Sequence, residues 1–297
     1  MAWAMMLRPL MLVIVALAAC APEATARPIT ATPALWVVRD ADTEIVLLGA
    51  IHVLPDSVEW RGGRVGGAIA RADTLVLEVG DIADPQAQSA RFLALGRSDA
   101  LPPVGDRVPA ELRGELARIA GDSGPPLATL DRLKSWAAAV ALGGGMWRDI
   151  GASREDGVDS VLADIFIRAK KPIVGLETAD AQFALFDSLS EADQRVLLAR
   201  AIVEGHDPKA RFAAMLDAWA KGDTTAIAAT FGDTMRASPT LADALIGKRN
   251  AAWADWIARR METPGRVLVA VGAGHLAGAG SVQERLQAKG LAVARVQ

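Results

Sequence analysis

The sequence predicts an α/β protein with a mixed, largely parallel central sheet, flanked by helices and carrying a helical insertion in the middle of the chain. Short apolar runs typical of buried strands alternate with helical stretches near both ends, as in a sheet covered on both faces. Between about residues 105 and 260 the pattern is largely helical, broken by the turn sequences GDSGPP and GGG. The 297 residues, 52% of them hydrophobic, suffice for one large core, so we expect a single domain over residues 34–297.

The first residues are typical of an export signal. Arg8 precedes an apolar run over residues 10–19 that ends in small residues, as in a secretory signal peptide. The sequence LAAC resembles a bacterial lipobox and ends in Cys20, the one cysteine of the chain. We therefore predict a lipoprotein signal peptide over residues 1–20, lipidation of Cys20, and an Ala/Pro/Thr-rich tether over residues 21–33.

This signal implies a location and a membrane partner. The protein is expected to be exported to the cell envelope and lipid-anchored on the periplasmic side of a bacterial membrane. The alternative is an ordinary signal peptide cut after the sequence ATA at residues 24–26, which leaves no lipid. No second run of about twenty apolar residues follows the signal.

The first strands of the sheet are predicted from three apolar runs. LWVVRD (35–40) and EIVLLGA (44–50) flank the sequence ADT and predict a hairpin of buried strands. A helix over about residues 65–72 leads to another buried strand, TLVLEVG (74–80).

The middle of the chain contains one further strand and several helices. KPIVGLET (171–178) predicts a strand within the helical section. Ser190 and the pair Asp207-Pro208 are both placed as starts of amphipathic helices, because these residues favour the first positions of a helix.

The C-terminal part returns to the alternating pattern. A helix over residues 249–261 precedes the strand RVLVAVG (266–272). Ser281, with Glu284 three residues later, forms a capping-box sequence that opens the last helix, and LAVARV closes the chain as a strand.

Two of the three histidines occupy equivalent places on two similar strands. His52 follows IVLLGAI and His275 follows VLVAVGAG, and each has a glycine three residues before it. Glu78 and Glu177 end two further apolar strands. Because ligands bind at the carboxyl ends of strands in open α/β sheets, we expect these four side chains to converge within roughly 8 Å.

Two imidazoles and two carboxylates at one edge suit two kinds of chemistry. They can hold a divalent metal of the zinc, manganese or cobalt type. They can equally perform acid–base catalysis without a metal. The structural alternative is that the histidines are satisfied by hydrogen bonds at strand ends and that the glutamates pair with lysine or arginine.

Several other kinds of site are not supported. The sequence has no G-x-S-x-G or H-E-x-x-H, and GAGHLAG does not have the glycine spacing of a dinucleotide-binding turn. His206, in EGHDP, precedes a helix start and is expected at the surface. A formal net charge of −3 with short, mixed charge runs gives no sign of a nucleic-acid partner.

Motifs spread from about Leu35 to the C-terminus resemble those of the TraB/PrgY/GumN family, in its GumN-like bacterial branch. They are GAIHVLP, LVLEV, GLETADAQ, RNAAW and VGAGHLAGAGSVQERLQAKG. This family includes the Tiki metalloproteases and is similar in its core to erythromycin-esterase-like and ChaN-like proteins. The resemblance implies an α/β core in which two Gly-x-x-His motifs and a glutamate form the site.

The resemblance also assigns residues. His52 and His275 match the two motif histidines, Glu78 matches the glutamate that ends the second core strand, and Glu177 matches the glutamate of GLET. The other matched residues are the glutamine after GLET, the Arg-Asn pair and an aspartate of the EDGVD sequence, which here are Gln182, Arg249, Asn250 and Asp159.

The sequence therefore favours a metal-dependent, peptidase-like hydrolase that acts on a peptide or another small envelope substrate. His52, His275 and Glu177 are expected to hold a Zn, Mn or Co ion, which lowers the pKa of a bound water. Glu78 is expected to take that water's proton, although the two glutamates can exchange these catalytic roles. The alternatives are a metal-free, esterase-like hydrolase with a histidine base, and a non-enzymatic envelope protein that binds peptide or assists polysaccharide export.

Overall fold

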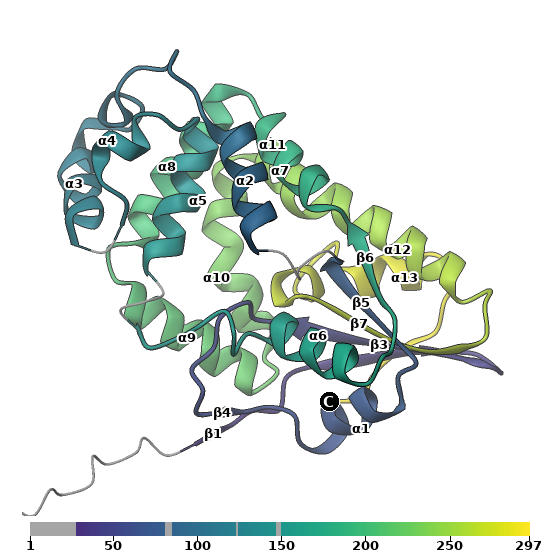
Figure 1. Ribbon diagram of the computed structural model, residues 1–297. Helices are drawn as coiled ribbons and strands as arrows, with labels where there is room; N and C mark the ends of the chain where they lie inside the picture. The colour runs from purple at the N-terminus through teal and green to yellow at the C-terminus, as the bar shows by residue number, and fades with distance from the viewer. Residues whose placement is uncertain (1–27, 81–84, 123, 147–149) are drawn as a thin grey trace, which may run out of the picture.

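A six-stranded mixed sheet of order β6-β5-β7-β3-β2-β8 forms the centre of the computed structural model (Figure 1). The structure describes residues 28–80, 85–122, 124–146 and 150–297. Strands β3, β5, β6 and β7 run parallel to one another, whereas β2 is antiparallel to both β3 and β8. The predicted fold class, an α/β protein with a largely parallel mixed sheet, is confirmed.

The six strands of the main sheet lie within two residues of the bounds predicted from the apolar runs. The strands of the described residues are β1 (Ile29–Thr30), β2 (Leu35–Arg39), β3 (Thr43–Ala50), β4 (Val58–Glu59), β5 (Thr74–Val79), β6 (Ile173–Glu177), β7 (Gly265–Gly272) and β8 (Val293–Arg295). The pairs β1 and β4, which no run predicted, form a separate two-stranded sheet.

Helices fill most of the chain between β5 and β7. The α-helices are α1 (Gly63–Arg71), α2 (Pro85–Gly96), α3 (Arg113–Asp122), α4 (Leu127–Leu130), α5 (Ser135–Met146), α6 (Val158–Arg168), α7 (Ala179–Asp187), α8 (Glu191–Glu204), α9 (Pro208–Ala220), α10 (Thr224–Ala237), α11 (Pro239–Ala242), α12 (Lys248–Arg260) and α13 (Val282–Ala288). The shorter helices are η1 (Val104–Asp106), η2 (Ala110–Leu112), the π-helix η4 (Asp243–Gly247) and η5 (Ala273–Leu276).

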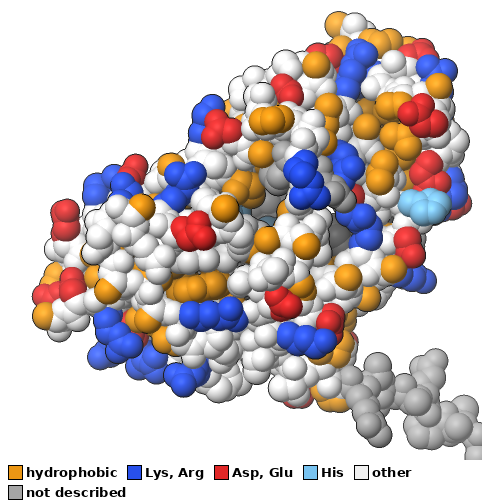
Figure 2. Space-filling model, turned by 180° about the vertical axis from the view of Figure 1, so that it is seen from behind, with side chains coloured by type: hydrophobic (Ala, Val, Ile, Leu, Met, Phe, Trp, Pro, Cys, Tyr) orange, Lys and Arg blue, Asp and Glu red, His pale blue; other side chains and the backbone are white. Residues whose placement is uncertain are grey.

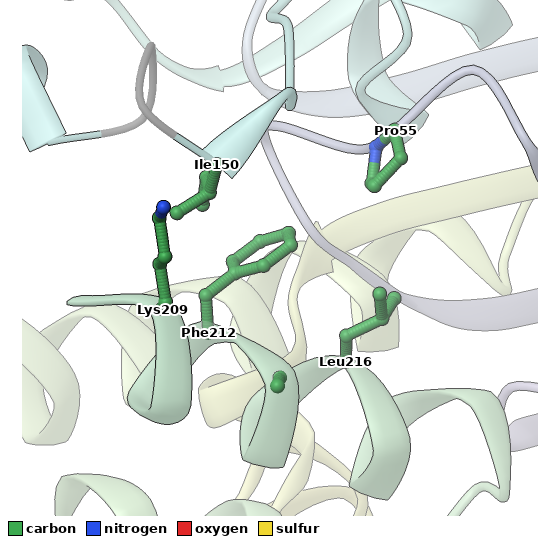
Figure 3. Close-up of a pocket in the computed structure, with 6 residues that line it drawn as sticks. Pro55, Ile150, Lys209, Phe212 and Leu216 are labelled. Carbon is green, nitrogen blue, oxygen red and sulfur yellow. The ribbon is translucent and has the colours of Figure 1, made fainter. Parts of the chain in front are cut away.

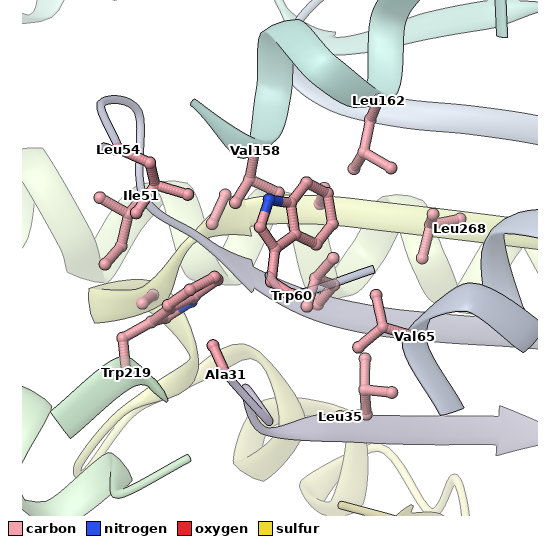
Figure 4. Close-up of a cluster of buried hydrophobic side chains, with 14 of the residues drawn as sticks. Ala31, Leu35, Ile51, Leu54, Trp60, Val65, Val158, Leu162, Trp219 and Leu268 are labelled. Atoms are coloured by element: carbon pink, nitrogen blue, oxygen red, sulfur yellow. The ribbon is translucent and has the colours of Figure 1, made fainter. Parts of the chain in front are cut away.

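Alternate residues of the strands face two different hydrophobic clusters, as expected for a sheet buried on both faces. On one face, Leu48 and Leu268 pack with α1, α6 and α9, where Trp60 and Trp219 are also buried (Figure 4). On the other face, the neighbouring strand residues pack with α12 and α13. A third cluster, around the fully buried Trp136, holds the helices of the middle section together beside the sheet (Figure 1). On the face of the molecule shown in Figure 2, Lys and Arg side chains are interspersed with Asp and Glu side chains and with hydrophobic ones.

Two of the three predicted helix starts are capped by their side chains and one is not. Ser190 accepts a hydrogen bond from the amide of Asp193, and Asp207 accepts one from Ala210 with proline at the first helical position, as predicted. Ser281 differs, because its side chain makes no cap bond and its hydroxyl oxygen is buried without a partner among the described residues. Glu284 does accept a backbone hydrogen bond at the helix start, but from the amide of Gly280, at 2.8 Å, and not from that of Ser281.

The folded part of the chain begins before residue 34, the predicted start of the domain. The tether predicted over residues 21–33 has its last part in the fold, because Ile29–Thr30 pairs in parallel with Val58–Glu59 and Ala31 is buried. The predicted signal peptide, including Cys20, lies outside the described residues. Among the described helices, none has both the length and the apolar character needed to cross a membrane.

Candidate functional site

The carboxyl ends of the four parallel strands bring the predicted residues to one edge of the sheet. Ala50 of β3 lies in register with Gly272 of β7, so His52 follows its strand beside the point where β7 turns into η5. His275 lies within η5. Val79 of β5 lies in register with Glu177 of β6, which places Glu78 and Glu177 at the same level.

Glu78 is a buried carboxylate at the centre of this edge. Its Oε1 accepts from the backbone amide of Gly272 at 2.7 Å, and its Oε2 accepts from Nη2 of Arg249 at 2.6 Å. Nε2 of Gln182, on α7, donates more weakly to Oε2 at 3.5 Å. Burial alone would raise the pKa of Glu78, but electrostatic interactions with His275, Arg249 and His52 and the hydrogen bond from the Gly272 amide outweigh it and lower that pKa to about 2. Glu78 is therefore an anion at neutral pH.

Arg249, in the first turn of α12, connects the two glutamates to His275. Its Nε donates to Oε1 of Glu177 at 2.8 Å, and its Nη1 donates to Nε2 of His275 at 3.1 Å. The guanidinium also lies over the ring of Trp253, one helical turn further along α12, at 4.6 Å from the ring centre. The Trp253 indole donates to the same Oε1 of Glu177 at 3.0 Å.

His275 is held as a neutral imidazole in one tautomer. Its Nδ1 lies 2.6 Å from Oδ1 of Asn250, and the Asn250 amide nitrogen donates to the carbonyl of Gly280 at 2.9 Å. Since Oδ1 can only accept, Nδ1 carries the proton and Nε2 presents its lone pair to Arg249. Burial lowers the pKa of His275 to about 4, and the Arg249 charge acts in the same direction against the attraction of Glu78.

His52 has the opposite environment. Its Nδ1 lies 2.7 Å from Oδ2 of Asp159, in the first turn of α6, and 55% of its side chain is exposed. The Asp159 carboxylate raises the pKa of His52 to about 9 against the effect of desolvation, and Glu78 adds to the rise. His52 is therefore an imidazolium at neutral pH, screened in part by solvent.

Gly272 explains how the two histidines approach Glu78. A Cβ atom at this position would lie 3.1 Å from Oε1 of Glu78, 3.6 Å from Cδ2 of His275 and 3.8 Å from Nε2 of His52. All three side chains thus border the space that a side chain here would fill. The glycine of this strand end keeps the space open between them.

The structure brings most of the predicted residues together at this edge of the sheet. Arg249 contacts the side chains of Glu78, Glu177 and His275. His52 lies beside Gly272, which also borders Glu78 and His275. The residues assigned by resemblance also lie here: Gln182, Arg249, Asn250 and Asp159. Trp253, which was not among the predicted site residues, contacts both His275 (ring centres 4.4 Å apart) and Glu177. Its signal was the four-residue spacing from Arg249, which puts both on one helix face.

The expected metal ligands do not form a metal site as they lie. Among the described residues, no three His, Cys, Asp or Glu side chains are grouped so that they could hold an ion. The donor atoms are of a suitable chemical kind, but Arg249 donates to His275 and Glu177, two of the three expected ligands. A bound ion would require this arginine to move.

Comparison with known proteins shows which family the chain resembles over most of its length. The model of the TraB/PrgY/gumN family matches residues 34–295. The uncharacterized protein YbaP of Escherichia coli (strain K12) is 27% identical over 255 residues, which cover 86% of this chain and 92% of YbaP. YbaP of Shigella flexneri matches to the same extent. No solved structure matches.

Proposed function

Because the chain belongs to the TraB/PrgY/gumN family and carries this site, we propose that it is a hydrolase that works by acid–base catalysis on an ester or amide bond, a peptide being the first candidate. One observation carries the proposal. His52 and Glu78 border the same space at Gly272, and their environments push their pKa values apart, to about 9 and about 2. Such a split between neighbouring groups is typical of acid and base roles.

His52 is the proton donor in this proposal. Its pKa of about 9 keeps the imidazolium populated at neutral pH, and its side chain is the exposed one of the pair. Asp159 holds the Nδ1 proton and so fixes the ring orientation, leaving Nε2–H to face the site. A substrate leaving group above Gly272 would take this proton.

Glu78 is the proton acceptor. It remains ionised near neutral pH, and the Gly272 amide and Arg249 fix its two oxygens. Water attacks the carbonyl carbon of the substrate and gives a proton to Glu78, while the bond to the leaving group breaks and that group takes the His52 proton. His275 and Glu177 act through Arg249, which they hold in place.

A metal-dependent version is the second candidate, and one feature favours it. Both histidines are anchored through Nδ1, as in metal-binding histidines, which leaves Nε2 of His52 for a ligand and also Nε2 of His275 once Arg249 moves away. Glu177 Oε2 is buried with no hydrogen-bond partner among the described residues. His52, His275 and Glu177 would hold the ion, which would supply a water of lowered pKa.

One set of preparations tests the activity. Purified protein is assayed on a panel of peptides and p-nitrophenyl esters, with His52→Ala beside His206→Ala. His206 is the matched control, an exposed histidine (78%) whose Nδ1 likewise faces a carboxylate, that of Glu115. We expect His52→Ala to lose roughly 10²–10⁴-fold in rate and His206→Ala to keep the wild-type rate. Equal rates for all three proteins would contradict the proposal, and a wild type inert on the whole panel would favour a binding protein.

The metal question is answered on the same preparations. Elemental analysis without chelator is combined with Glu78→Gln, which keeps the shape of the side chain. Under the metal-free proposal, wild type contains no stoichiometric metal, chelator leaves the rate unchanged, and Glu78→Gln is slow. Stoichiometric metal that is lost in His52→Ala and kept in Glu78→Gln would replace it by the metal-dependent version.

A further inference from the structure

A groove of about 410 Å³ lies beside the loop that carries His52 (Figure 3). It is lined by Pro55, Ile150, Lys209, Phe212, Ala213 and Leu216. Its volume is in the range of small-molecule sites, and most of its wall is apolar. None of these residues belongs to the set of acid–base groups described above.

One wall of the groove is a single face of α9. Lys209, Phe212 and Leu216 follow at spacings of three and four, so they lie along one side of the helix, and Trp219 continues the same row. The Trp219 indole donates to the carbonyl of Gly49 at 2.8 Å. This bond fixes the face of α9 against the end of β3, three residues before His52.

The opposite wall is formed by Pro55 and Ile150, which lie in the two segments that hold His52 and Asp159 together. Pro55 is three residues from His52, so their Cα atoms are at most about 11 Å apart. Leu54 and Ser153 exchange backbone hydrogen bonds of 3.0 and 2.9 Å, which join this loop to the segment that runs from Ile150 to Asp159. The groove therefore lies along the same loop that carries the proposed proton donor.

The groove combines an apolar floor with positive charge. Lys209 is exposed, is the charged member of the lining, and extends towards Ile150 at one end, while Phe212 and Leu216 form the floor (Figure 3). Arg154 lies close enough to His52 for its charge to act on the imidazole. This charge suits a ligand that has an apolar group and a carboxylate.

We propose that the groove binds the C-terminal residue of a short peptide, with its apolar side chain on Phe212 and Leu216 and its free carboxylate against Lys209. The inference rests on the proposed hydrolase function, because it makes the residue in the groove the leaving group. The water oxygen bonds to the preceding carbonyl carbon and the C–N bond breaks. One water proton goes to Glu78, and the amine nitrogen of the released residue takes the His52 proton. Solvent then returns the proton from Glu78 to His52.

Binding of two probes tests the recognition of the carboxylate. N-acetyl-phenylalanine and its amide are titrated calorimetrically into wild type and into His52→Ala, which is expected to bind without turnover. The free acid should bind roughly two- to fivefold more tightly, the range of an exposed ion pair. Lys209→Met should abolish this preference and Lys209→Arg should keep it. Lys221→Met, at the far end of α9, is the control and should change nothing.

A second pair of variants tests the apolar floor without removing buried side chains. Ala213 and Ala214 are neighbours and both exposed on α9, but only Ala213 lines the groove. Ala213→Trp should fill the groove and weaken binding of N-acetyl-phenylalanine by roughly tenfold or more, whereas Ala214→Trp should bind as wild type does. Equal thermal melts of the two variants establish that both are folded.

The outcomes separate this inference from the proposed function. Equal affinity for acid and amide, or equal binding by the two tryptophan variants, overturns the inference. Binding as expected without hydrolysis of N-benzoyl-glycyl-phenylalanine overturns the hydrolase proposal and leaves the carboxylate-binding groove in place. Hydrolysis of that peptide and of its C-terminal amide at the same kcat/KM supports the hydrolase and overturns the groove's role.

Discussion

The two histidines of the site differ in the group that holds Nδ1. His52 is bonded to a carboxylate and exposed, whereas His275 is bonded to an amide oxygen and buried. A carboxylate favours the charged imidazolium, and burial disfavours it. The same motif therefore yields a charged ring after β3 and a neutral ring after β7.

Asp159→Asn tests this assignment. Removing the carboxylate removes the main cause that raises the pKa of His52, so this pKa should fall from about 9 toward the ordinary value of 6.5. As His52 is the proton donor, the alkaline limb of kcat/KM should move down by roughly two pH units. NMR titration of the His52 ring measures the pKa directly, and Glu115→Gln beside His206 is the control. An unchanged His52 pKa would show that Asp159 does not set its charge.

Among the elements, the start of α6 is built against the His52 loop. The amide of Val158 donates to the carbonyl of Ile51 at 3.0 Å, and a Cβ on Gly157 would overlap the backbone oxygen of His52. Only a glycine allows this approach, which presents Asp159 to the imidazole. The helix start and the loop thus form one unit.

Gly157→Ala should therefore damage both stability and the site. The added methyl group must displace the His52 backbone, which should lower the free energy of unfolding by roughly 1–3 kcal/mol. Gly114→Ala in α3 is the matched control, because a Cβ there meets nothing within 4 Å, and it should be neutral or stabilise by up to about 1 kcal/mol. Urea unfolding of both variants measures the difference. Equal stability of the two variants would mean that the His52 loop moves away from the added methyl group without a cost in free energy.

The sequence predicted elements better than the contacts between them. Apolar runs located the strands of the main sheet, and their ends located His52, Glu78, Glu177 and His275, because strand ends follow from local composition. Arg249 was assigned by the family resemblance and not by any local pattern, because an arginine near a helix start is usually a solvated charge. Its contact with Glu177, 72 residues away, depends on how α12 packs against the sheet. Ser281 had the local capping pattern, but its hydroxyl is not used.

At the scale of the whole molecule, the site depends on the helices docked onto the sheet. Asp159 comes from α6, Gln182 from α7, and both Arg249 and Asn250 from α12. The contacts of Asp159 with His52 and of Arg249 with Glu78 and Glu177 join ionised groups that the unfolded chain leaves in water. The stability of the fold is therefore coupled to pH through the site.

The contributions of His52 and His275 to the free energy of unfolding should together be greatest near pH 6.5. As pH falls from 6.5 to about 4, the unfolded chain protonates His275 and the native state does not, so stability decreases. The stability that protonated His52 contributes is complete below pH 6.5 and is lost as pH rises through about 9. Exposure makes this alkaline limb the shallower of the two.

Urea unfolding at acid, neutral and alkaline pH measures these limbs. Asp159→Asn should flatten the alkaline limb and leave the acid limb unchanged, because His275 contacts Asn250 and not Asp159. Further loss below pH 4.5 is expected from Glu78, whose low native pKa of about 2 makes its contribution present above 4.5 and lost below it. Stability that rises as pH falls from 6.5 to 5 would contradict the buried, neutral state of His275.

Attachment of the whole molecule to a membrane is predicted to depend on Cys20. The lipobox-like LAAC places the one cysteine where a lipid would be added, and a buried acyl chain stabilises membrane binding by about 0.8 kcal/mol per methylene group. Wild type should therefore fractionate with membranes and incorporate labelled palmitate, whereas Cys20→Ser should be released and unlabelled. Ala24→Asp, which disrupts the ATA sequence and leaves LAAC intact, is the control and should remain in the membrane fraction. A wild type that fractionates as soluble with an N-terminus near Arg27 would show that the ordinary signal peptide is used and that the protein carries no lipid.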